Sequence, residues 1–294
     1  MIIDTTNITN KAIPENLSKK LRASYYFMGA LLGKYKKAYM FFPGGCSIGK
    51  RPINLHLKGF EALGAKITEE DNYYKIAAET LKGSHIYLDV ASVGATINIM
   101  LAAVKASGKT IIENAAKEPE IVNVAKFLNN MGAKITGAGT DKITIVGVES
   151  LNGCFTEVIP DRIEAGTYII LGALLGDNLK VTNIIPEHIE ALIMKLKEMN
   201  IPLEIHSDYL IISKSNKAKS VNIKTVGYPG FPTDLQQPFT TLLTTCHGKS
   251  IVHETIYENR FQNVAYLNEM GADITIKGDK IYIKGPTKLI GKEV

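Results

Sequence analysis

Cysteine is scarce in this chain of 294 residues, which holds only Cys46, Cys154 and Cys246. The odd count and the lack of any C-x-x-C pair argue against a disulfide framework or a zinc ribbon, and they favour a reducing compartment. A chain of about 300 residues can bury roughly 75% of the surface that its unfolded form exposes, so its core needs no such staple. We therefore expect one or two packed domains.

Long hydrophobic runs are also missing. The longest nearly apolar stretches, residues 99–104 and 168–175, are far shorter than the roughly 20 residues that a membrane-spanning helix needs. Residues 1–11 lack the basic and apolar regions of a secretory signal. We expect no membrane partner and a cytoplasmic location.

The chain has only a small excess of charge of one sign, and it lacks the common catalytic motifs. The 34 Lys and Arg against 29 Asp and Glu leave a net charge of +5, which suits anionic small molecules. No basic stripe with interleaved aromatic residues is present, so nucleic acid is not expected as a partner. The histidines are scattered without H-E-x-x-H spacing, and neither G-x-S-x-G nor G-x-G-x-x-G occurs. We therefore predict no metal and no cofactor, and we exclude the common hydrolase and dinucleotide-binding classes.

A repeat of about 70 residues runs through the chain. The pattern Gly-Ala-x-Ile follows an apolar segment three times, with its glycine at Gly64, Gly132 and Gly271. A weaker copy has Asn200 in place of the glycine. The successive spacings are 68, 68 and 71 residues. Gly or Asn at such a place is typical of a helix that ends in a left-handed residue. A fixed period of this length is typical of a chain built from repeated structural units.

Each repeat also carries a longer amphipathic segment that predicts a helix. These segments are residues 17–35, 93–106, 163–175 and 235–246. A shorter helix is predicted at 119–131, and short strands are predicted at 143–146, 209–212 and 281–283. Acidic residues at the starts of three long segments, Asp89, Asp161 and Asp234, are expected to cap free backbone N–H groups.

The predicted unit is a long helix, a strand, a shorter helix and a strand pair, and four units fit in the chain. An isolated unit cannot bury both faces of its sheet, so units should pack in groups. Residues 151–160 follow a strand pair and precede a helix, which marks a boundary. We therefore expect an α/β protein with mixed sheets and two globules, residues 1–158 and 159–294.

Residues 43–52, PGGCSIGKRP, form the most unusual local sequence. Residues 44–50 match G-x-x-x-x-G-K, but Arg51 stands where a nucleotide-binding loop has the Ser or Thr that holds Mg²⁺. Lys50, Arg51 and nearby backbone amides would stabilise the thiolate of Cys46, which could be a nucleophile or a proton donor. Cys154 and Cys246 lie in or beside apolar runs and are expected to be inert.

This loop is followed in order by E-N-A-A-K-E-P-E-I-V at 113–122, F-P-T-D-L-Q at 231–236 and E-N-R-F at 258–261. The short motifs L-R-A-S at 21–24, S-V-G-A-T at 92–96 and P-D-R-I-E at 160–164 also fit. Together these motifs resemble the UDP-N-acetylglucosamine enolpyruvyl transferase family, over essentially the whole chain.

The resemblance implies an inside-out α/β barrel of two globules, which the family builds from six units, with substrates between the globules. It implies transfer of the enolpyruvyl group from phosphoenolpyruvate to the 3′-hydroxyl of UDP-N-acetylglucosamine, with release of phosphate, in peptidoglycan precursor synthesis. A monomer or weak oligomer is expected.

The resemblance also implies roles for particular residues. Cys46 would donate a proton to the phosphoenolpyruvate methylene group, can form a covalent adduct with it, and is the residue that fosfomycin alkylates. Asp234 would be the base for the attacking hydroxyl, and Arg51 would contact phosphate groups. The implied substrate-binding residues are Arg22, Arg51, Pro52, Ile53, Asn54, Leu55, Ser92, Val93, Gly94, Asp234, Ile256 and Arg260.

The chain departs from the family pattern at both ends. It contains neither the Ser-Gly-Ala-Lys-Asn motif nor the Asp-Leu-Arg motif, and the repeat count leads us to expect about one unit fewer at each end. Two alternatives stay open: a non-catalytic UDP-sugar-binding paralogue or remnant, and the related enolpyruvyl shikimate phosphate synthase. The latter shares the fold but does not use the loop cysteine, so P-G-G-C at 43–46 argues against it.

Overall fold

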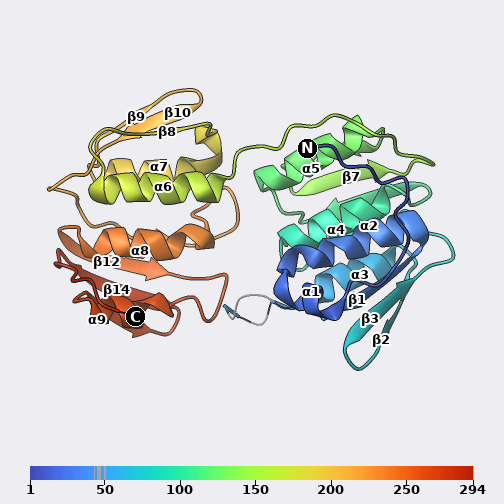
Figure 1. Cartoon of the computed structure of the whole chain (residues 1–294), viewed down its shortest axis with the longest axis horizontal. Coiled ribbons are helices and arrows are strands. Elements are labelled where there is room, and N and C mark those ends of the chain that lie inside the picture. The colour runs from blue at the N-terminus through green and yellow to red at the C-terminus, as the bar shows by residue number, and fades with distance from the viewer. Residues whose placement is uncertain (43, 45–47, 50, 294) are drawn as a thin grey trace. The chain divides into compact units, whose positions relative to one another are not determined.

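The computed structural model describes residues 1–42, 44, 48–49 and 51–293. By their contacts these residues form two compact units. Unit 1 holds the described residues up to 44 together with 51–158, and unit 2 holds Ile48, Gly49 and residues 159–293. Residues 147–161, which contain no helix or strand, connect the two units along the chain (Figure 1).

Unit 1 contains two sheets in the described part of the chain, with orders β1-β3-β2 and β4-β5-β7-β6. The first half comprises α1 (Glu15–Lys20), η1 (Arg22–Tyr25), α2 (Tyr26–Tyr35), β1 (Lys37–Phe41), α3 (Asn54–Ala62), β2 (Lys66–Glu69) and β3 (Tyr73–Ala77). The second half comprises β4 (His85–Tyr87), α4 (Val93–Ala103), β5 (Lys109–Glu113), α5 (Pro119–Asn130), β6 (Lys134–Thr136) and β7 (Lys142–Val146). The pair β4 and β5, which flanks α4 in the chain, is parallel, and the other pairs are antiparallel.

Unit 2 has the same construction, with described sheets β8-β10-β9 and β11-β12-β14-β13. Its first half comprises α6 (Arg162–Leu175), β8 (Leu179–Thr182), η2 (Pro186–Ile189), α7 (Glu190–Glu198), β9 (Leu203–Ile205) and β10 (Tyr209–Ile212). Its second half comprises β11 (Ile223–Lys224), η3 (Thr233–Leu235), α8 (Gln236–Thr244), β12 (Gly248–His253), α9 (Asn263–Glu269), β13 (Asp273–Lys277) and β14 (Lys280–Gly285). Again the strands that flank the long helix, β11 and β12, are parallel.

The predicted repeat is confirmed. Over the described residues, the order helix, strand, helix, strand pair occurs four times, beginning at α2, α4, α6 and α8, and the first helix is the longer one except in the second copy, where α4 has 11 residues and α5 has 12. The residues that end the shorter helices have left-handed backbones, with φ of 94° at Gly64, 104° at Gly132, 59° at Asn200 and 102° at Gly271. Glycine and asparagine tolerate this conformation best, which is why the pattern is visible in the sequence.

Two details of the helix predictions for unit 1 are wrong. Residues 17–35 do not form one helix, because Leu21 is extended (φ −120°, ψ 104°) and separates α1 from η1 and α2. Asp89 does not cap α4: Ser92 does, its Oγ accepting from the N–H of Ala95 at 3.3 Å, while Asp89 pairs with Lys58 at 2.7 Å. Ser92 stands immediately before the first helical residue, the place from which a side chain can reach the free N–H groups.

The expected cap at Asp161 is confirmed. Its Oδ1 accepts from the N–H groups of Ile163 at 2.8 Å and Glu164 at 3.1 Å. The cap satisfies two of the N–H groups that the first turn of α6 would otherwise leave without partners.

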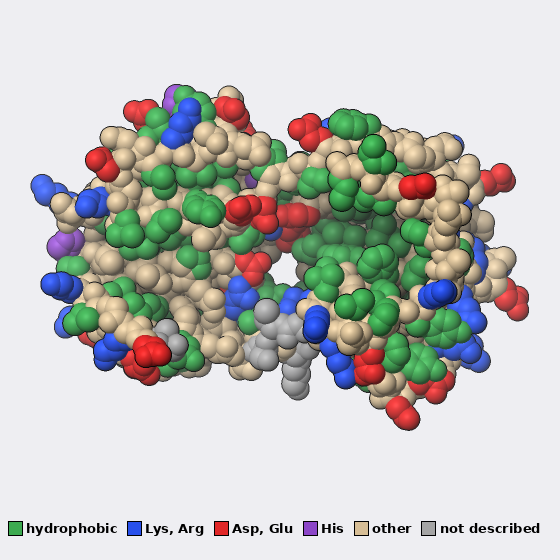
Figure 2. All heavy atoms as spheres, viewed as in Figure 1, with side chains coloured by type: hydrophobic (Ala, Val, Ile, Leu, Met, Phe, Trp, Pro, Cys, Tyr) green, Lys and Arg blue, Asp and Glu red, His purple; other side chains and the backbone are tan. Residues whose placement is uncertain are grey.

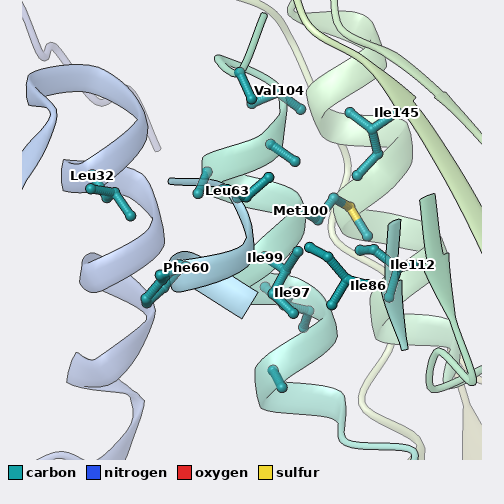
Figure 3. Packing of buried hydrophobic residues seen from close by; sticks show 14 of the residues in the cluster. Leu32, Phe60, Leu63, Ile86, Ile97, Ile99, Met100, Val104, Ile112 and Ile145 are labelled. Carbon is teal, nitrogen blue, oxygen red and sulfur yellow. The ribbon is translucent and has the colours of Figure 1, made fainter. Parts of the chain in front are cut away.

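Each unit has its own hydrophobic core. In unit 1, Leu32 of α2, Phe60 of α3 and Met100 of α4 are fully buried and belong to one cluster that also includes strand residues such as Ile112 (Figure 3). The helices α2 and α4 lie between the two sheets of this unit. Their close approach requires Gly29, because a Cβ atom there would collide with the carbonyl oxygen of Asn98.

Both units also expose apolar side chains. On the face drawn in Figure 2, hydrophobic side chains line a hollow in unit 1. In unit 2, Tyr168, Leu171 and Leu175 form an exposed row along α6, at helical spacing. Such rows are typical of surfaces that pack against another element. Among the helices of the described residues, none combines the length and the hydropathy that crossing a membrane would require.

Candidate active site

The loop that contains Cys46 is only partly described, and Cys46 itself lies outside the described residues. The loop residues Ile48 and Gly49 belong to unit 2. The backbone N–H of Asn259 donates to the carbonyl oxygen of Ile48 at 3.1 Å. A Cβ atom at Gly49 would collide with the Glu258 carboxylate. This part of the loop therefore lies against the E-N-R-F segment, next to Arg260.

Arg22 and Arg51 are brought together in unit 1. The Nη2 group of Arg22 donates to the carbonyl oxygen of Arg51, and its guanidinium carbon lies 5.5 Å from the centre of the Tyr25 ring. Arg51 has a left-handed backbone (φ 44°), which is uncommon for a residue with a side chain. The bond holds the Arg22 side chain against the backbone of Arg51, and guanidinium groups are suited to phosphate groups, which they can bind with paired hydrogen bonds.

The residues after Arg51 form the start of α3. Ile53 occupies the N-cap position of α3 and its side chain is buried in the core, so it anchors the segment. Pro52 and Asn54 are exposed, and Leu55 is half-buried. Of these four predicted binding residues, Pro52 and Asn54 are thus the most accessible to a ligand.

Ser92, Val93 and Gly94 form the start of α4. Ser92 caps the N–H of Ala95, and the first N–H groups of a helix, here those of Val93 and Gly94, have no intrahelical partner. The positive end of the helix dipole adds to their attraction for an anion. The 11-residue helix therefore presents donors at the place where the resemblance expects a diphosphate.

His56, in the first turn of α3, was not predicted as a functional residue. It is 4% exposed, and its Nδ1 lies 2.8 Å from Nδ2 of Asn98. Burial, together with the nearby Arg22 guanidinium, lowers the pKa of His56 from 6.5 to about 4. The ring is therefore neutral near pH 7.

This pKa predicts a loss of stability in acid. Between pH 6.5 and 4 the unfolded chain takes up a proton on His56 that the folded chain does not, so stability falls as the pH drops through this range. We expect unit 1 to lose about 3 kcal/mol, at roughly 1.4 kcal/mol for each unit of pKa. Denaturant titrations at pH 7 and pH 4 measure the loss. A His56→Asn chain, whose amide oxygen can still accept from Asn98, serves as the control, and an equal loss in that chain would contradict the assignment to His56.

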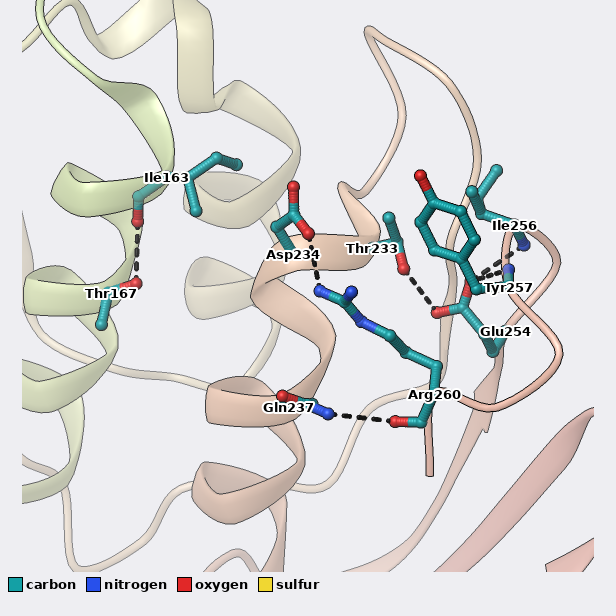
Figure 4. Close-up of polar contacts among 9 residues, drawn as sticks. All are labelled: Ile163, Thr167, Thr233, Asp234, Gln237, Glu254, Ile256, Tyr257 and Arg260. Carbon is teal, nitrogen blue, oxygen red and sulfur yellow. Dashed lines mark hydrogen bonds and ion pairs between the residues drawn. The ribbon is translucent and has the colours of Figure 1, made fainter. Parts of the chain in front are cut away.

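In unit 2 the structure places Asp234 beside Arg260 (Figure 4). Asp234 lies in η3, and its Oδ1 accepts from Nη2 of Arg260 at 2.6 Å. The predicted helix cap at Asp234 is thus wrong, because its carboxylate is used in this ion pair. The Arg260 side chain is 10% exposed and the Asp234 side chain is 56% exposed. Arg260 therefore holds the carboxylate from the protein side while leaving it accessible.

Glu254 organises the same region and was not predicted. It is 3% exposed, and its Oε1 accepts from the N–H groups of Ile256 at 2.8 Å and Tyr257 at 3.2 Å. Its Oε2 accepts from Oγ1 of Thr233 at 2.9 Å. One buried carboxylate thus joins the turn that carries Ile256 to the residue before Asp234. Its place in E-T-I-Y-E-N-R-F, two residues before Ile256, was the signal in the sequence.

A cavity of about 460 Å³ lies beside this turn, wholly within unit 2. Its lining includes Ile256, which is 41% exposed, the ring of Tyr257 and the side chain of Phe261. The guanidinium of Arg260 lies 5.7 Å from the centre of the Tyr257 ring. The lining also includes the acidic residues Glu254, Glu258 and Asp279, so the cavity offers both apolar and anionic surface beside Tyr257.

The chain is similar to known proteins over its whole length. The family model described as EPSP synthase (3-phosphoshikimate 1-carboxyvinyltransferase) matches residues 1–294. The chain is 55% identical over 293 residues to a protein named UDP-N-acetylglucosamine 1-carboxyvinyltransferase 2 from Listeria monocytogenes, covering all of this chain and 69% of that protein. It is 54% identical to a protein of the same name from Bacillus cereus, covering 68% of that protein.

Two solved structures have the same fold. The enolpyruvyl transferase NikO from Streptomyces tendae matches with a TM-score of 0.84 at 21% identity, covering 96% of this chain and 67% of NikO. EPSP synthase from Acinetobacter baumannii matches with a TM-score of 0.65 at 24% identity, covering 90% of this chain and 64% of that chain. The predicted fold class, the inside-out α/β fold of enolpyruvyl transferases, is confirmed.

Proposed function

The chain belongs to the EPSP synthase family, and from this premise we propose that it transfers the enolpyruvyl group from phosphoenolpyruvate to the 3′-hydroxyl of UDP-N-acetylglucosamine. Phosphate is the second product. The observation that carries the proposal is the 54–55% identity, over the whole chain, to proteins named for a carboxyvinyl transfer to that sugar nucleotide. The reaction supplies a precursor of peptidoglycan, and a cytoplasmic location stays a prediction.

The proposed chemistry is an addition followed by an elimination. Cys46 gives a proton to the methylene carbon of phosphoenolpyruvate, and the adjacent carbon becomes an oxocarbenium-like centre. The 3′-hydroxyl oxygen bonds to that centre while its proton passes to Asp234. The C–O bond to phosphate then breaks and phosphate leaves with the bonding electrons, while the methyl group returns a proton to the Cys46 thiolate and the double bond forms again on the transferred group.

The remaining predicted residues bind the substrates in this proposal. The guanidinium of Arg51 contacts phosphate, and Arg22, which donates to the Arg51 carbonyl, lies close to the nucleotide sugar. Ser92, Val93 and Gly94 hold the diphosphate at the start of α4. The accessible residues Pro52 and Asn54, with Leu55 and Ile256, contact the UDP-sugar, and Ile53 and Arg260 keep their segments in place.

Phosphate release tests the proposal. The purified chain is mixed with phosphoenolpyruvate and UDP-N-acetylglucosamine, and inorganic phosphate is measured against a Cys46→Ala chain and against a mixture without the sugar nucleotide. We expect release that requires both substrates and Cys46. Binding of UDP-N-acetylglucosamine without release would support a non-catalytic sugar-binding protein. Release with shikimate 3-phosphate as the acceptor would support the EPSP synthase reaction.

A further inference from the structure

A buried amide joins three helices of unit 1. Asn98 of α4 is fully buried, and its Nδ2 donates to Nδ1 of His56 at 2.8 Å and to the carbonyl oxygen of Tyr25 at 3.1 Å. Its Oδ1 accepts from the N–H of Gly29 at 2.9 Å. Turning the amide over would bring oxygen against oxygen at Tyr25 and donor against donor at Gly29, so its orientation is settled by the network.

This orientation determines the protonation of the His56 ring. Because Nδ1 accepts a hydrogen bond from Asn98, it cannot carry a proton, and the proton of the neutral ring must be on Nε2. The groups that face the ring are Arg22 and Tyr25 of η1 and Asn98 and Gly94 of α4. Arg22 is the cation among them and opposes a second proton on the ring.

The Nε2 edge of His56 faces the start of α4. A Cβ atom at Gly94 would lie 3.1 Å from Nε2 of His56 and 2.8 Å from Oη of Tyr25. In the part of the chain that the structure describes, no hydrogen bond to Nε2 is present. His56 is 4% exposed, and Nε2 is not among its fully buried atoms, so this nitrogen can be reached from solvent while most of the ring is enclosed. A ligand at the first turn of α4 would supply a hydrogen-bond partner for it.

We propose that Asn98 is a positioning residue that holds His56 in its Nε2–H tautomer, so that a neutral donor faces the phosphoryl-binding start of α4. The inference rests on the proposed function, because the phosphoryl group is that of the sugar nucleotide. The Nε2–H group of His56 is thus one more hydrogen-bond donor beside the backbone N–H groups of Val93 and Gly94, and it adds no charge. Asn98 never contacts the ligand and acts through His56.

Two measurements on the full chain test the inference. The first is ¹⁵N NMR of a chain that carries ¹⁵N-labelled histidine, and the second is calorimetric titration with UDP-N-acetylglucosamine. In the wild-type chain we expect His56 to show a single Nε2–H tautomer. In Asn98→Leu we expect both tautomers and a Kd for UDP-N-acetylglucosamine at least tenfold higher. Asn129→Leu is the matched control, because Asn129 makes the same kind of double contact, at 2.9 Å each, with the backbone of Ile135. It should leave both readouts unchanged.

Asn98→Asp keeps the test open if the leucine variant does not fold. The new carboxylate would attract a proton to Nδ1, and the pKa of His56 should rise by at least two units. An Asn98→Leu chain that binds within twofold of wild type, or an Asn98→Asp chain with an unshifted His56, would overturn the inference alone. A wild-type chain that shows the Nε2–H tautomer but does not bind UDP-N-acetylglucosamine would overturn the proposed function and, with it, the ligand named here.

Discussion

An Asp234→Asn chain will release phosphate about 10²- to 10⁴-fold more slowly than the wild-type chain, which is the usual contribution of a positioned base. Asparagine has the same shape, and its amide oxygen can still accept from Nη2 of Arg260, which lies 2.6 Å from Oδ1 of Asp234. The fold and the ion-pair partner are thus kept, while the proton of the 3′-hydroxyl loses its acceptor. Single-turnover phosphate release measures the rate.

Asp161→Asn is the matched control for this substitution. Asp161 is an exposed carboxylate of the same unit, and it caps α6 by accepting from the N–H groups of Ile163 and Glu164. Asparagine is an equally good cap, so we expect a rate within twofold of wild type. An Asp234→Asn chain with that same rate would refute the base role. Binding of UDP-N-acetylglucosamine, measured by calorimetry, should be similar in all three chains.

A Cys46→Ser chain will not be labelled by fosfomycin, whereas the wild-type chain will take up one equivalent. The hydroxyl of serine is far less nucleophilic than a thiolate, and we expect the cations Lys50 and Arg51, which follow Cys46 closely in the sequence, to favour its thiolate form. Intact-mass spectrometry after incubation with fosfomycin measures the labelled fraction. Full labelling of the Cys46→Ser chain would rule out Cys46 as the alkylated residue.

The other two cysteines provide the controls. Cys154 is exposed, so Cys154→Ser shows whether access alone permits labelling. Cys246 is buried, and burial raises the pKa of its thiol to about 11, which leaves little thiolate near neutral pH. We expect Cys154→Ser and Cys246→Ser to be labelled as fully as the wild-type chain, because Cys46 is the residue that the resemblance identifies as the target of fosfomycin.

Features that depend on a few consecutive residues were predicted well. The left-handed helix ends at Gly64, Gly132, Asn200 and Gly271 follow from the backbone preferences of glycine and asparagine. Helix α6 begins where Asp161 can cap it. These helix ends depend on residues within one or two helical turns, so the local sequence is enough to predict them. The capping prediction failed at Asp89 because Ser92 stands closer to the first turn of α4.

The arrangement of the candidate site was decided by tertiary packing. The sequence determined the repeat, the family and the residue types, but not that Asp234 would give up its cap to pair with Arg260, 26 residues away. It did not show that Glu254 would hold Thr233 and the turn at Ile256, or that Asn98 would fix the ring of His56 across 42 residues. Such contacts form only when separate helices and strands bury their apolar faces together, because burial makes an unpaired polar group costly and so selects its partner.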